Sequence, residues 1–288
     1  MNYILYNPLS GTGKAEENAK SLKGFDKNDT VYKDISKITD HNAFVENLTE
    51  NDIVVLCGGD GTLNRFVNDT EGLDIPCDIL YVASGTGNDF LNDIEKSKED
   101  CPLSVKKYLS GLPTVTVKGN TYRFINNVGF GIDGYCCEVG DELKKKSDKP
   151  VNYTAIAIKG LLFHYKPTNA TVIVDGKEHS YKNVWIAPTM KGRFYGGGMM
   201  ATPMQDRTDA DGKLSVMLFY GKGRLKTLMV FPSIFKGEHI KHKDMVTIHS
   251  GKEITVKFDR PAPLQIDGET ILGVTEYTAY AKCHAYQN

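Results

Sequence analysis

Residues 58–64 read GGDGTLN, a composition typical of a phosphate-binding turn, and they follow a short apolar run at 52–56. Glycines let a ligand approach the bare backbone, and the unpaired N–H groups of a helix N-terminus attract anions. A carboxylate beside bound phosphate repels it unless a cation intervenes, so Asp60 indicates Mg²⁺ or the hydroxyl of a phosphoryl acceptor. The alternative is a tight strand-to-helix turn in which Asp60 only caps the helix.

A strand and a helix are predicted to position this turn. The β-branched run at 52–56 is typical of a buried parallel strand. Leu63, Phe66 and Val67 mark one face of the following helix, and Thr62 is available as its N-cap. The pattern returns at 78–82, a second apolar strand, which is followed by SGTGNDF at 84–90, with Asp89 just past the strand end.

A third glycine loop, NPLSGTGK at 7–14, follows the first predicted strand at 3–6 and precedes a predicted helix at 15–22. It is not a Walker A motif, because that motif needs Gly where Pro8 stands and Ser or Thr where Ala15 stands. The Ser10 and Thr12 hydroxyls can still face a nucleotide. Alternating strands and helices predict a parallel, doubly wound sheet with all three loops at one edge.

Composition narrows the function classes. The chain has 288 residues and is 40% hydrophobic, with 35 Lys and Arg, 36 Asp and Glu, and a net charge of −1. This balance does not favour a nucleic-acid binder. The 6 cysteines show no CxxC pair and no metal-ligand spacing, which suits a reducing cytosol. With no signal peptide and no membrane-spanning stretch, we expect a cytoplasmic protein, soluble or peripheral to a membrane.

The pattern changes near Leu112 and Pro113, which predicts two domains, 1–113 and 114–288. From 114 onward, short strands of β-branched and aromatic residues alternate with turns such as Asp175-Gly176. Helices are predicted at 137–146, 151–164 and 224–235. The predicted fold class is an α/β, doubly wound N-terminal domain followed by an antiparallel β-sandwich with helical insertions.

Four motifs, in this order and spacing, resemble the diacylglycerol kinase catalytic-domain family, which includes bacterial lipid kinases, sphingosine kinases and ceramide kinases. They are NPxSG at 7–11, GGDGT at 58–62, GTxNDF at 85–90 and IDGE at 266–269. The resemblance covers nearly the whole chain. GGDGT alone is shared with NAD kinases and phosphofructokinases, whereas NPxSG and GTxNDF narrow the family.

The resemblance implies an NAD-kinase-like or diacylglycerol-kinase-like N-terminal domain, with ATP in a cleft between the two domains. The residues implied at the ATP are Asn7, Ser10, Gly58, Gly59, Asp60, Gly61, Thr62, Asn64, Thr86, Asn88 and Asp89. Asp60, Asp89 and Glu269 would surround Mg²⁺, which prefers hard oxygen ligands.

The same resemblance places the catalytic base at 266–269. Asp267 or Glu269 would accept the proton of the acceptor hydroxyl, with Asp60 also essential for transfer. Residues two apart share a face in a strand but need not in a turn, so the spacing does not decide between the two acids. We favour Glu269. The alternative is an ordinary hairpin turn with exposed acids.

A second metal position is implied at Thr208, Asp211 and Lys213, where bacterial members hold Mg²⁺ through one carboxylate and backbone carbonyls. The family usually continues Asp-Gly-x-Leu-Asp, whereas Ser215 stands at the last place here. A plain Asp-Gly turn is the alternative. The family also often has Asn before its glycine triplet, where this chain has Met190-Lys191.

The leading hypothesis is an ATP-dependent lipid kinase that phosphorylates diacylglycerol or a related membrane lipid at the inner membrane face, in phospholipid biosynthesis. Two clusters bear on the lipid. The first cluster, which lines an apolar slot or belongs to the core, is Phe194, Tyr195, Met199, Met200 and Met204. The second cluster, which is a membrane contact or a buried helix face, is Phe231, Ile234 and Phe235 with Lys236. The alternatives are an NAD kinase-like enzyme and a non-catalytic nucleotide-binding protein; a homodimer is left open.

Overall fold

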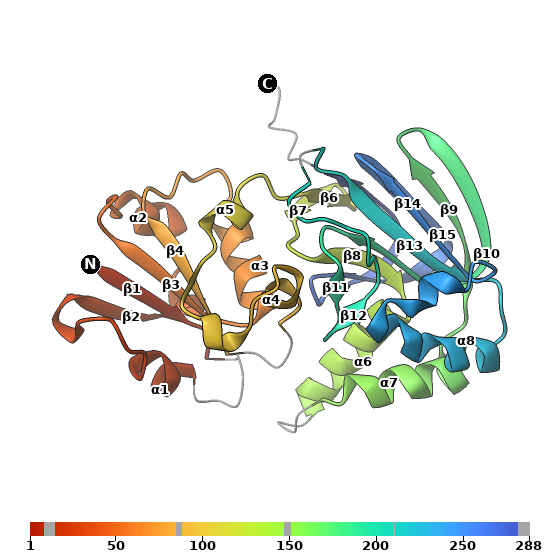
Figure 1. Ribbon diagram of the computed structural model, residues 1–288, viewed down its shortest axis with the longest axis horizontal. Coiled ribbons are helices and arrows are strands. Elements are labelled where there is room, and N and C mark those ends of the chain that lie inside the picture. Colours follow the sequence, from red (N-terminus) through yellow and green to blue (C-terminus); the bar gives the residue numbers. More distant parts are fainter. Residues whose placement is uncertain (9–14, 85–87, 147–150, 210, 282–288) are drawn as a thin grey trace. The chain divides into compact units, whose positions relative to one another are not determined.

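The computed structural model describes residues 1–8, 15–84, 88–146, 151–209 and 211–281. The chain divides into two compact units, Met1–Leu112 (unit 1) and Pro113–Asn288 (unit 2), as Figure 1 shows. The division falls one residue before the predicted domain boundary. In the part that the structure describes, no helix is both long and apolar enough to cross a bilayer.

Unit 1 is built on a five-stranded sheet in the order β2-β1-β3-β4-β5. The strands β1 (Asn2–Tyr6), β2 (Thr30–Asp34), β3 (Ile53–Gly58) and β4 (Asp78–Ala83) are parallel, whereas β5 (Leu103–Ser104) is antiparallel. β3 is the middle strand and is almost entirely buried, as expected for a parallel strand that is covered on both faces.

Helices cover both faces of this sheet. Ala19 packs in one cluster with Ile4, whereas the ring of Phe44 contacts Tyr3, which precedes Ile4 and points to the opposite face. The predicted doubly wound α/β fold is therefore confirmed. The helical segments are α1 (Ala15–Lys20), η1 (Lys27–Asp29), η2 (Ile35–Lys37), α2 (His41–Glu46), α3 (Asp60–Asp69), α4 (Asp89–Asp93), η3 (Lys98–Asp100) and α5 (Lys106–Leu109).

Unit 2 is an antiparallel β fold, also as predicted. Its nine-stranded sheet runs β14-β13-β10-β8-β15-β16-β6-β7, and β9 pairs with both β10 and β15. Because β8 also pairs with β10 and with β15, these four strands close a ring around an apolar core. The strands are β6 (Thr114–Val117), β7 (Asn120–Arg123), β8 (Asn127–Gly131), β9 (Thr168–Val174), β10 (Lys177–Met190), β13 (Leu214–Tyr220), β14 (Val246–Gly251), β15 (Glu253–Ile266) and β16 (Glu269–Tyr280), with a small hairpin of β11 (Phe194–Tyr195) and β12 (Met199–Met200).

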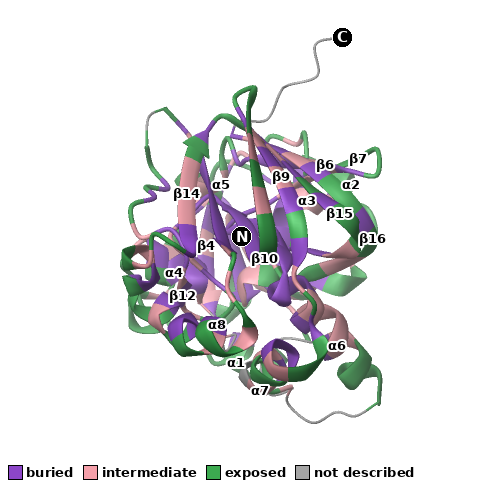
Figure 2. Cartoon of the chain, turned by 90° about the vertical axis from the view of Figure 1, so that its right-hand side faces the viewer, coloured by how far each residue is buried: buried purple, intermediate pink, exposed green. Residues whose placement is uncertain are grey.

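Helices cover one outer face of this sheet and bury Trp185 and Phe219 in a second cluster. The predicted helix at 224–235 is divided into the α-helix α8 and the 3₁₀ segment η5. The division lies just before Pro232, which has no backbone N–H to donate to the helix. Figure 2 shows exposed residues on the outer sides of α7 and α8. The segments are α6 (Ile132–Lys146), α7 (Tyr153–Lys159), the π-helical η4 (Gly160–His164), α8 (Arg224–Val230), η5 (Phe231–Lys236) and η6 (Glu238–Lys241).

Candidate active site

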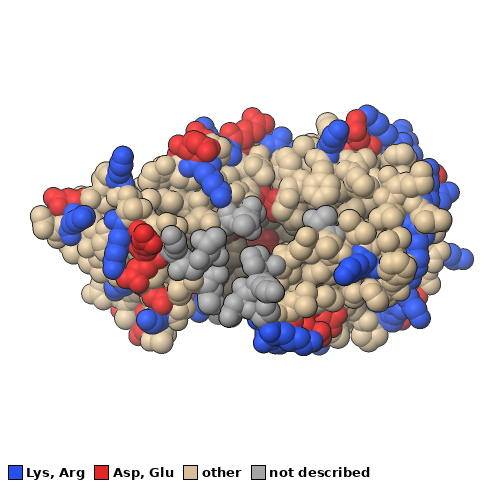
Figure 3. All heavy atoms as spheres, turned by 90° about the horizontal axis from the view of Figure 1, so that it is seen from below, with Lys and Arg blue, Asp and Glu red and all other residues tan. Residues whose placement is uncertain are grey.

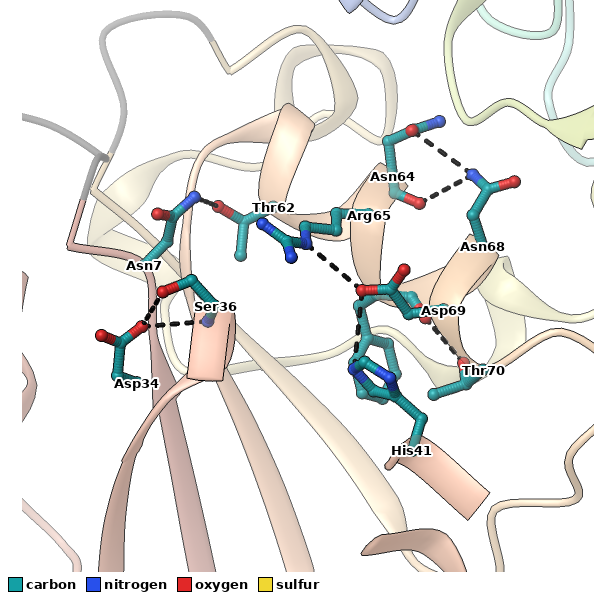
Figure 4. Close-up of polar contacts among 11 residues, drawn as sticks. Asn7, Asp34, Ser36, His41, Thr62, Asn64, Arg65, Asn68, Asp69 and Thr70 are labelled. Atoms are coloured by element: carbon teal, nitrogen blue, oxygen red, sulfur yellow. Dashed lines mark hydrogen bonds and ion pairs between the residues drawn. The ribbon is translucent and has the colours of Figure 1, made fainter. Parts of the chain in front are cut away.

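The glycine turn of unit 1 leads from β3 into α3. The helix begins at Asp60 with Gly59 as N-cap, and no side chain caps it. The prediction that Thr62 is the N-cap was wrong, because the N-cap is Gly59, three residues earlier. The Thr62 hydroxyl instead accepts a hydrogen bond from the Asn7 side-chain amide at 3.1 Å (Figure 4). A helix N-terminus without a capping side chain is suited to bind an anion.

The glycines of this turn have different roles. A Cβ at Gly58 would lie 2.1 Å from the Thr62 Oγ1, so only glycine fits there, whereas a Cβ at Gly61 would meet no atom within 4 Å. The Gly58 carbonyl accepts hydrogen bonds from the Tyr81 hydroxyl at 3.1 Å and the Ser84 N–H at 2.9 Å. The end of β3 is thereby tied to the end of β4, and Gly61 borders open space.

The Asp60 carboxylate links the first glycine turn to the start of α4. Its Oδ2 accepts hydrogen bonds from the backbone N–H groups of Asp89 at 2.8 Å and Phe90 at 3.4 Å. These N–H groups belong to the N-terminus of α4, so Asp60 caps a helix, although not its own. Asp89 is 5% exposed. The structure therefore brings the two acids predicted to bind Mg²⁺ to the same edge of the sheet.

Two further predicted nucleotide contacts, Asn64 and Asn88, lie within α3 and at the start of α4. Asn64 is buried, and its backbone and side-chain carbonyl oxygens accept hydrogen bonds from the Asn68 side chain at 2.9 and 3.3 Å (Figure 4). Asn88 is the N-cap of α4. Its buried Oδ1 and the buried Ser84 Oγ have no hydrogen-bond partner among the described residues.

Ser10 and Thr86 lie outside the described residues. A surface hollow of about 770 Å³ beside β2 and α2 has none of the predicted nucleotide contacts in its lining.

The acids predicted on unit 2 lie at the turn from β15 to β16. Asp267 and Gly268 have φ of 45° and 94°, the backbone of a two-residue Asp-Gly hairpin. The Asp267 carboxylate accepts hydrogen bonds from three successive backbone N–H groups, at residues 125–127 and at 2.5, 2.8 and 2.9 Å. Glu269 is exposed. Asp267 thus fixes the turn with both of its oxygens, and Glu269 is the accessible acid of the pair.

Buried polar residues behind this turn were not predicted. The Gln265 Oε1 accepts a hydrogen bond from the Gly268 N–H at 2.9 Å, and its Nε2 donates to the Asp133 Oδ2 at 3.4 Å. The Asp133 Oδ1 is buried without a hydrogen-bond partner in the described part of the chain. Burial raises the pKa of Asp133 from 3.8 to about 7.

Arg207 was missed as well. It is buried and donates to the Ile125 carbonyl at 2.6 Å and to the Asn126 Oδ1 at 2.8 Å. These partners are 82 and 81 residues away, so no local pattern points to them. Asp133 could have been found, because it follows a buried strand and opens a helix, as Asp60 and Asp89 do.

The predicted second metal position lies in the loop before β13. The Asp211 carboxylate lies 3.0 Å from the Lys213 Nζ, and the Lys213 carbonyl accepts a hydrogen bond from Gln205 at 2.8 Å. The Thr208 hydroxyl donates to Asp206 at 2.7 Å. The described residues contain no group of three or more His, Cys, Asp or Glu arranged to hold a metal. This metal position therefore stays a prediction.

The two apolar clusters considered for lipid contact divide between core and surface. Tyr195 and Met199 are buried in the second core cluster, whereas Met204 is 87% exposed. Phe231 and Ile234 are buried in the same cluster, because η5 packs this side against neighbouring elements. Of the two alternatives for this cluster, the buried helix face therefore holds for Phe231 and Ile234, whereas Phe235 is 44% exposed.

Comparison with known proteins follows the division into two units. Residues 2–116 match the diacylglycerol kinase catalytic domain, and residues 126–282 match the YegS C-terminal NAD kinase beta sandwich-like domain. The chain is 26% identical over 257 residues to a diacylglycerol kinase of Mycobacterium tuberculosis, covering 84% of this chain and 81% of that protein. It is 25% identical over 277 residues to a diacylglycerol kinase of Bacillus subtilis, covering 92% and 88%.

A solved structure shares the fold. The crystal structure of a candidate diacylglycerol kinase from Bacillus anthracis superposes with a TM-score of 0.70 at 16% identity, covering 97% of this chain and 91% of that chain.

Proposed function

The chain belongs to the diacylglycerol kinase catalytic-domain family and is a kinase, and we propose that it transfers the γ-phosphate of ATP to the hydroxyl group of diacylglycerol or a related membrane lipid. The observation that carries the proposal is the hydrogen bond from the Asp89 N–H to the Asp60 carboxylate. It joins two acids, at the starts of α3 and α4, at one edge of the unit 1 sheet, next to a helix N-terminus that no side chain caps.

Phosphate binding is assigned to the start of α3. The helix has 10 residues and no capping side chain, so its first N–H groups and its dipole favour a negative charge. Gly58 keeps the turn tight against Thr62, and Gly61 leaves the approach open. Asn7, which holds the Thr62 hydroxyl, supports the turn from the end of β1.

Mg²⁺ fits this edge, since Asp60 and Asp89 offer the hard carboxylate oxygens that the ion prefers. When bound, the ion would neutralise charge on the phosphates. The Asp60 carboxylate also positions the N-terminus of α4 directly, through its hydrogen bonds from the first N–H groups of that helix.

Glu269 is assigned as the general base. In the transfer, the lipid hydroxyl oxygen bonds to the γ-phosphorus, the bond from that phosphorus to the ADP oxygen breaks, and the hydroxyl proton moves to Glu269. Asp267 supports this role as a positioning residue, since its carboxylate is already bound by the amides of residues 125–127. The acceptor lies in the inner membrane face, which the protein contacts peripherally.

An acceptor screen tests the proposal. The full chain is incubated with Mg²⁺, ATP labelled at the γ-phosphate, and diacylglycerol, sphingosine, phosphatidylglycerol or NAD in separate reactions. We expect labelled product that partitions into organic solvent, with diacylglycerol or a related lipid as acceptor. Label in the aqueous phase with NAD alone would identify an NAD kinase-like enzyme, and no label with any acceptor would identify a non-catalytic nucleotide-binding protein.

The variant Asp60→Ala tests the site itself. We expect transfer to fall by about a thousandfold or more, the scale of losing preorganised charge stabilisation. The free energy of unfolding should fall by only about 1 kcal/mol, the usual cost of a lost helix cap. Asp69→Ala is the matched control, because Asp69 ends the same helix and its ion-pair partners in the described part of the chain are Arg65 and the partly buried His41 (Figure 4). Full activity of Asp60→Ala would contradict the assignment of Asp60 as a ligand of Mg²⁺.

A further inference from the structure

The outer face of α8 is apolar and exposed. Leu225 and Met229 are 73% and 78% exposed, and their spacing of four residues places them on the same face of the helix. Thr227 and Val230 on the other side are buried. The buried side of α8 is apolar as well, since Val230 belongs to the second core cluster and Leu228 packs against it, so apolar residues occupy the outer face in addition to the inner one, where an amphipathic helix usually carries polar residues.

The neighbouring segment η4 also exposes an apolar side chain. Phe163 is 71% exposed. The Arg224 side chain, at the start of α8, donates a hydrogen bond to the Leu161 carbonyl in η4 at 2.7 Å, so the two segments are in contact. Figures 1 and 2 show α7 and α8 on the same side of the unit 2 sheet. We call Phe163, Leu225 and Met229 the apolar face.

The two segments that carry the apolar face are basic and contain no acid, although Glu238 directly follows one of them and Asp244 pairs with Lys222 at 3.2 Å. Neither segment 151–167 nor segment 220–237 contains Asp or Glu, although the whole protein has a net charge of −1. The basic residues of the two segments are Lys159, Lys166, Lys222, Arg224, Lys226 and Lys236. Seen from this side, unit 2 shows a broad area with few charged side chains, with Lys and Arg, and some Asp and Glu, along its margin (Figure 3).

Exposed apolar side chains framed by Lys and Arg are suited to a lipid bilayer with anionic headgroups. The apolar groups enter the headgroup boundary, and the cations are attracted to the negative surface. A second copy of the chain is a poorer occupant, because a two-fold contact would place the same basic segments against each other.

We propose that the apolar face, with the basic residues around it, docks the protein on an anionic membrane surface. The inference deepens the proposed function, on which it rests for a lipid acceptor that lies in the bilayer.

Vesicle flotation tests the docking. The full chain is mixed with phosphatidylcholine vesicles with and without phosphatidylglycerol, and we expect binding that depends on phosphatidylglycerol. The double variant Leu225→Ser/Met229→Ser should lower the partition coefficient about tenfold or more, since two apolar side chains no longer enter the bilayer. Lys226→Gln should lower it about fivefold, the effect expected for one cation near the surface. All three positions are exposed, so the fold should be retained.

Matched controls lie elsewhere on unit 2. Leu272→Ser removes an apolar side chain that is 56% exposed on β16. Lys252→Gln removes an exposed cation that directly follows β14, at the end of the β13–β14 pair where β13 begins. The helix α8 follows the other end of this pair, where β13 ends. Both controls should bind vesicles as the wild type does. Equal vesicle binding of the wild type and the Leu225→Ser/Met229→Ser variant would overturn the docking proposal. It would also be overturned if light scattering showed a wild-type dimer and a monomeric variant while both bound vesicles equally.

A second substrate form separates docking from catalysis. Short-chain diacylglycerol in detergent micelles does not require the bilayer, so the double variant should retain wild-type phosphorylation there and lose it on vesicles. If the wild type phosphorylates no lipid but its vesicle binding still depends on Leu225 and Met229, the proposed acceptor is wrong and the docking surface stands.

Discussion

Two Asp-Gly turns of unit 2 have closely similar backbones. Asp175 and Gly176, between β9 and β10, have φ of 47° and 81°, and Asp267 and Gly268 have 45° and 94°. In both turns the carboxylate accepts hydrogen bonds from backbone N–H groups of a distant segment. Asp175 bonds residues 252 and 253 at 2.8 and 2.9 Å, and Asp267 bonds residues 125–127.

The difference between the turns lies beside the aspartate. Lys177 follows the first turn and Glu269 follows the second. Two residues before the aspartate, the first turn has the apolar Ile173, whereas the second has Gln265, which leads to the buried Asp133. The comparison teaches that the Asp of an Asp-Gly hairpin holds the backbone, and that any chemistry must come from its neighbours.

The largest expected effect is on activity. Glu269→Gln keeps the shape of the side chain but removes the proton acceptor, so kcat should fall by about 10²- to 10⁴-fold. The free energy of unfolding should change by less than about 0.5 kcal/mol, because Glu269 is exposed. Steady-state kinetics and thermal unfolding measure the two effects. Glu276→Gln, an exposed acid on the same strand, is the control; equal kcat for both variants would exclude Glu269 as the base.

Asp267→Ala should act on stability first. It leaves three N–H groups without their acceptor, which we expect to cost about 3 kcal/mol. For a unit of this size the midpoint of thermal unfolding should fall by about 5–10 °C. A variant that keeps the wild-type midpoint but loses activity would instead make Asp267 a catalytic residue.

Asp133→Asn should change the pH dependence of stability. Burial raises the pKa of Asp133 to about 7, so between pH 3.8 and that value the folded protein holds a proton that the unfolded chain has lost. Wild-type stability therefore falls as pH rises through this range, by at most about 1.4 kcal/mol per pH unit from this group. Urea unfolding from pH 5 to 8 should show the variant gaining stability relative to the wild type up to about pH 7. Parallel pH profiles would contradict this.

The smallest effect is expected at the first turn. Asp175→Ala removes the acceptor of two N–H groups on an exposed turn, where water can replace it, so the free energy of unfolding should fall by about 1 kcal/mol. Activity should not change. An equal loss of stability in Asp175→Ala and Asp267→Ala would show that burial behind the second turn adds nothing.

The edge of unit 1 shows what was predictable. The strand-turn-helix pattern at Asp60 is local, because a buried run and a glycine pair fix where a strand ends and a helix begins. Its detail was not predictable. The helix starts at Asp60 rather than after Thr62, and the Asp60 carboxylate accepts hydrogen bonds from N–H groups 29 and 30 residues away, which no local pattern predicts.

The amino-acid sequence alone determined the α/β and antiparallel β units, the positions of the glycine turns, and the family, since periodicity and turn chemistry act over a few residues. Only the tertiary structure decided which acid of the 267–269 turn is held and which is accessible. The three amides that hold Asp267 lie 140 to 142 residues before it, and they reach it only because β8 pairs with β15. The apolar face likewise depends on which side of α8 packs on the sheet, and helical spacing alone cannot choose that side.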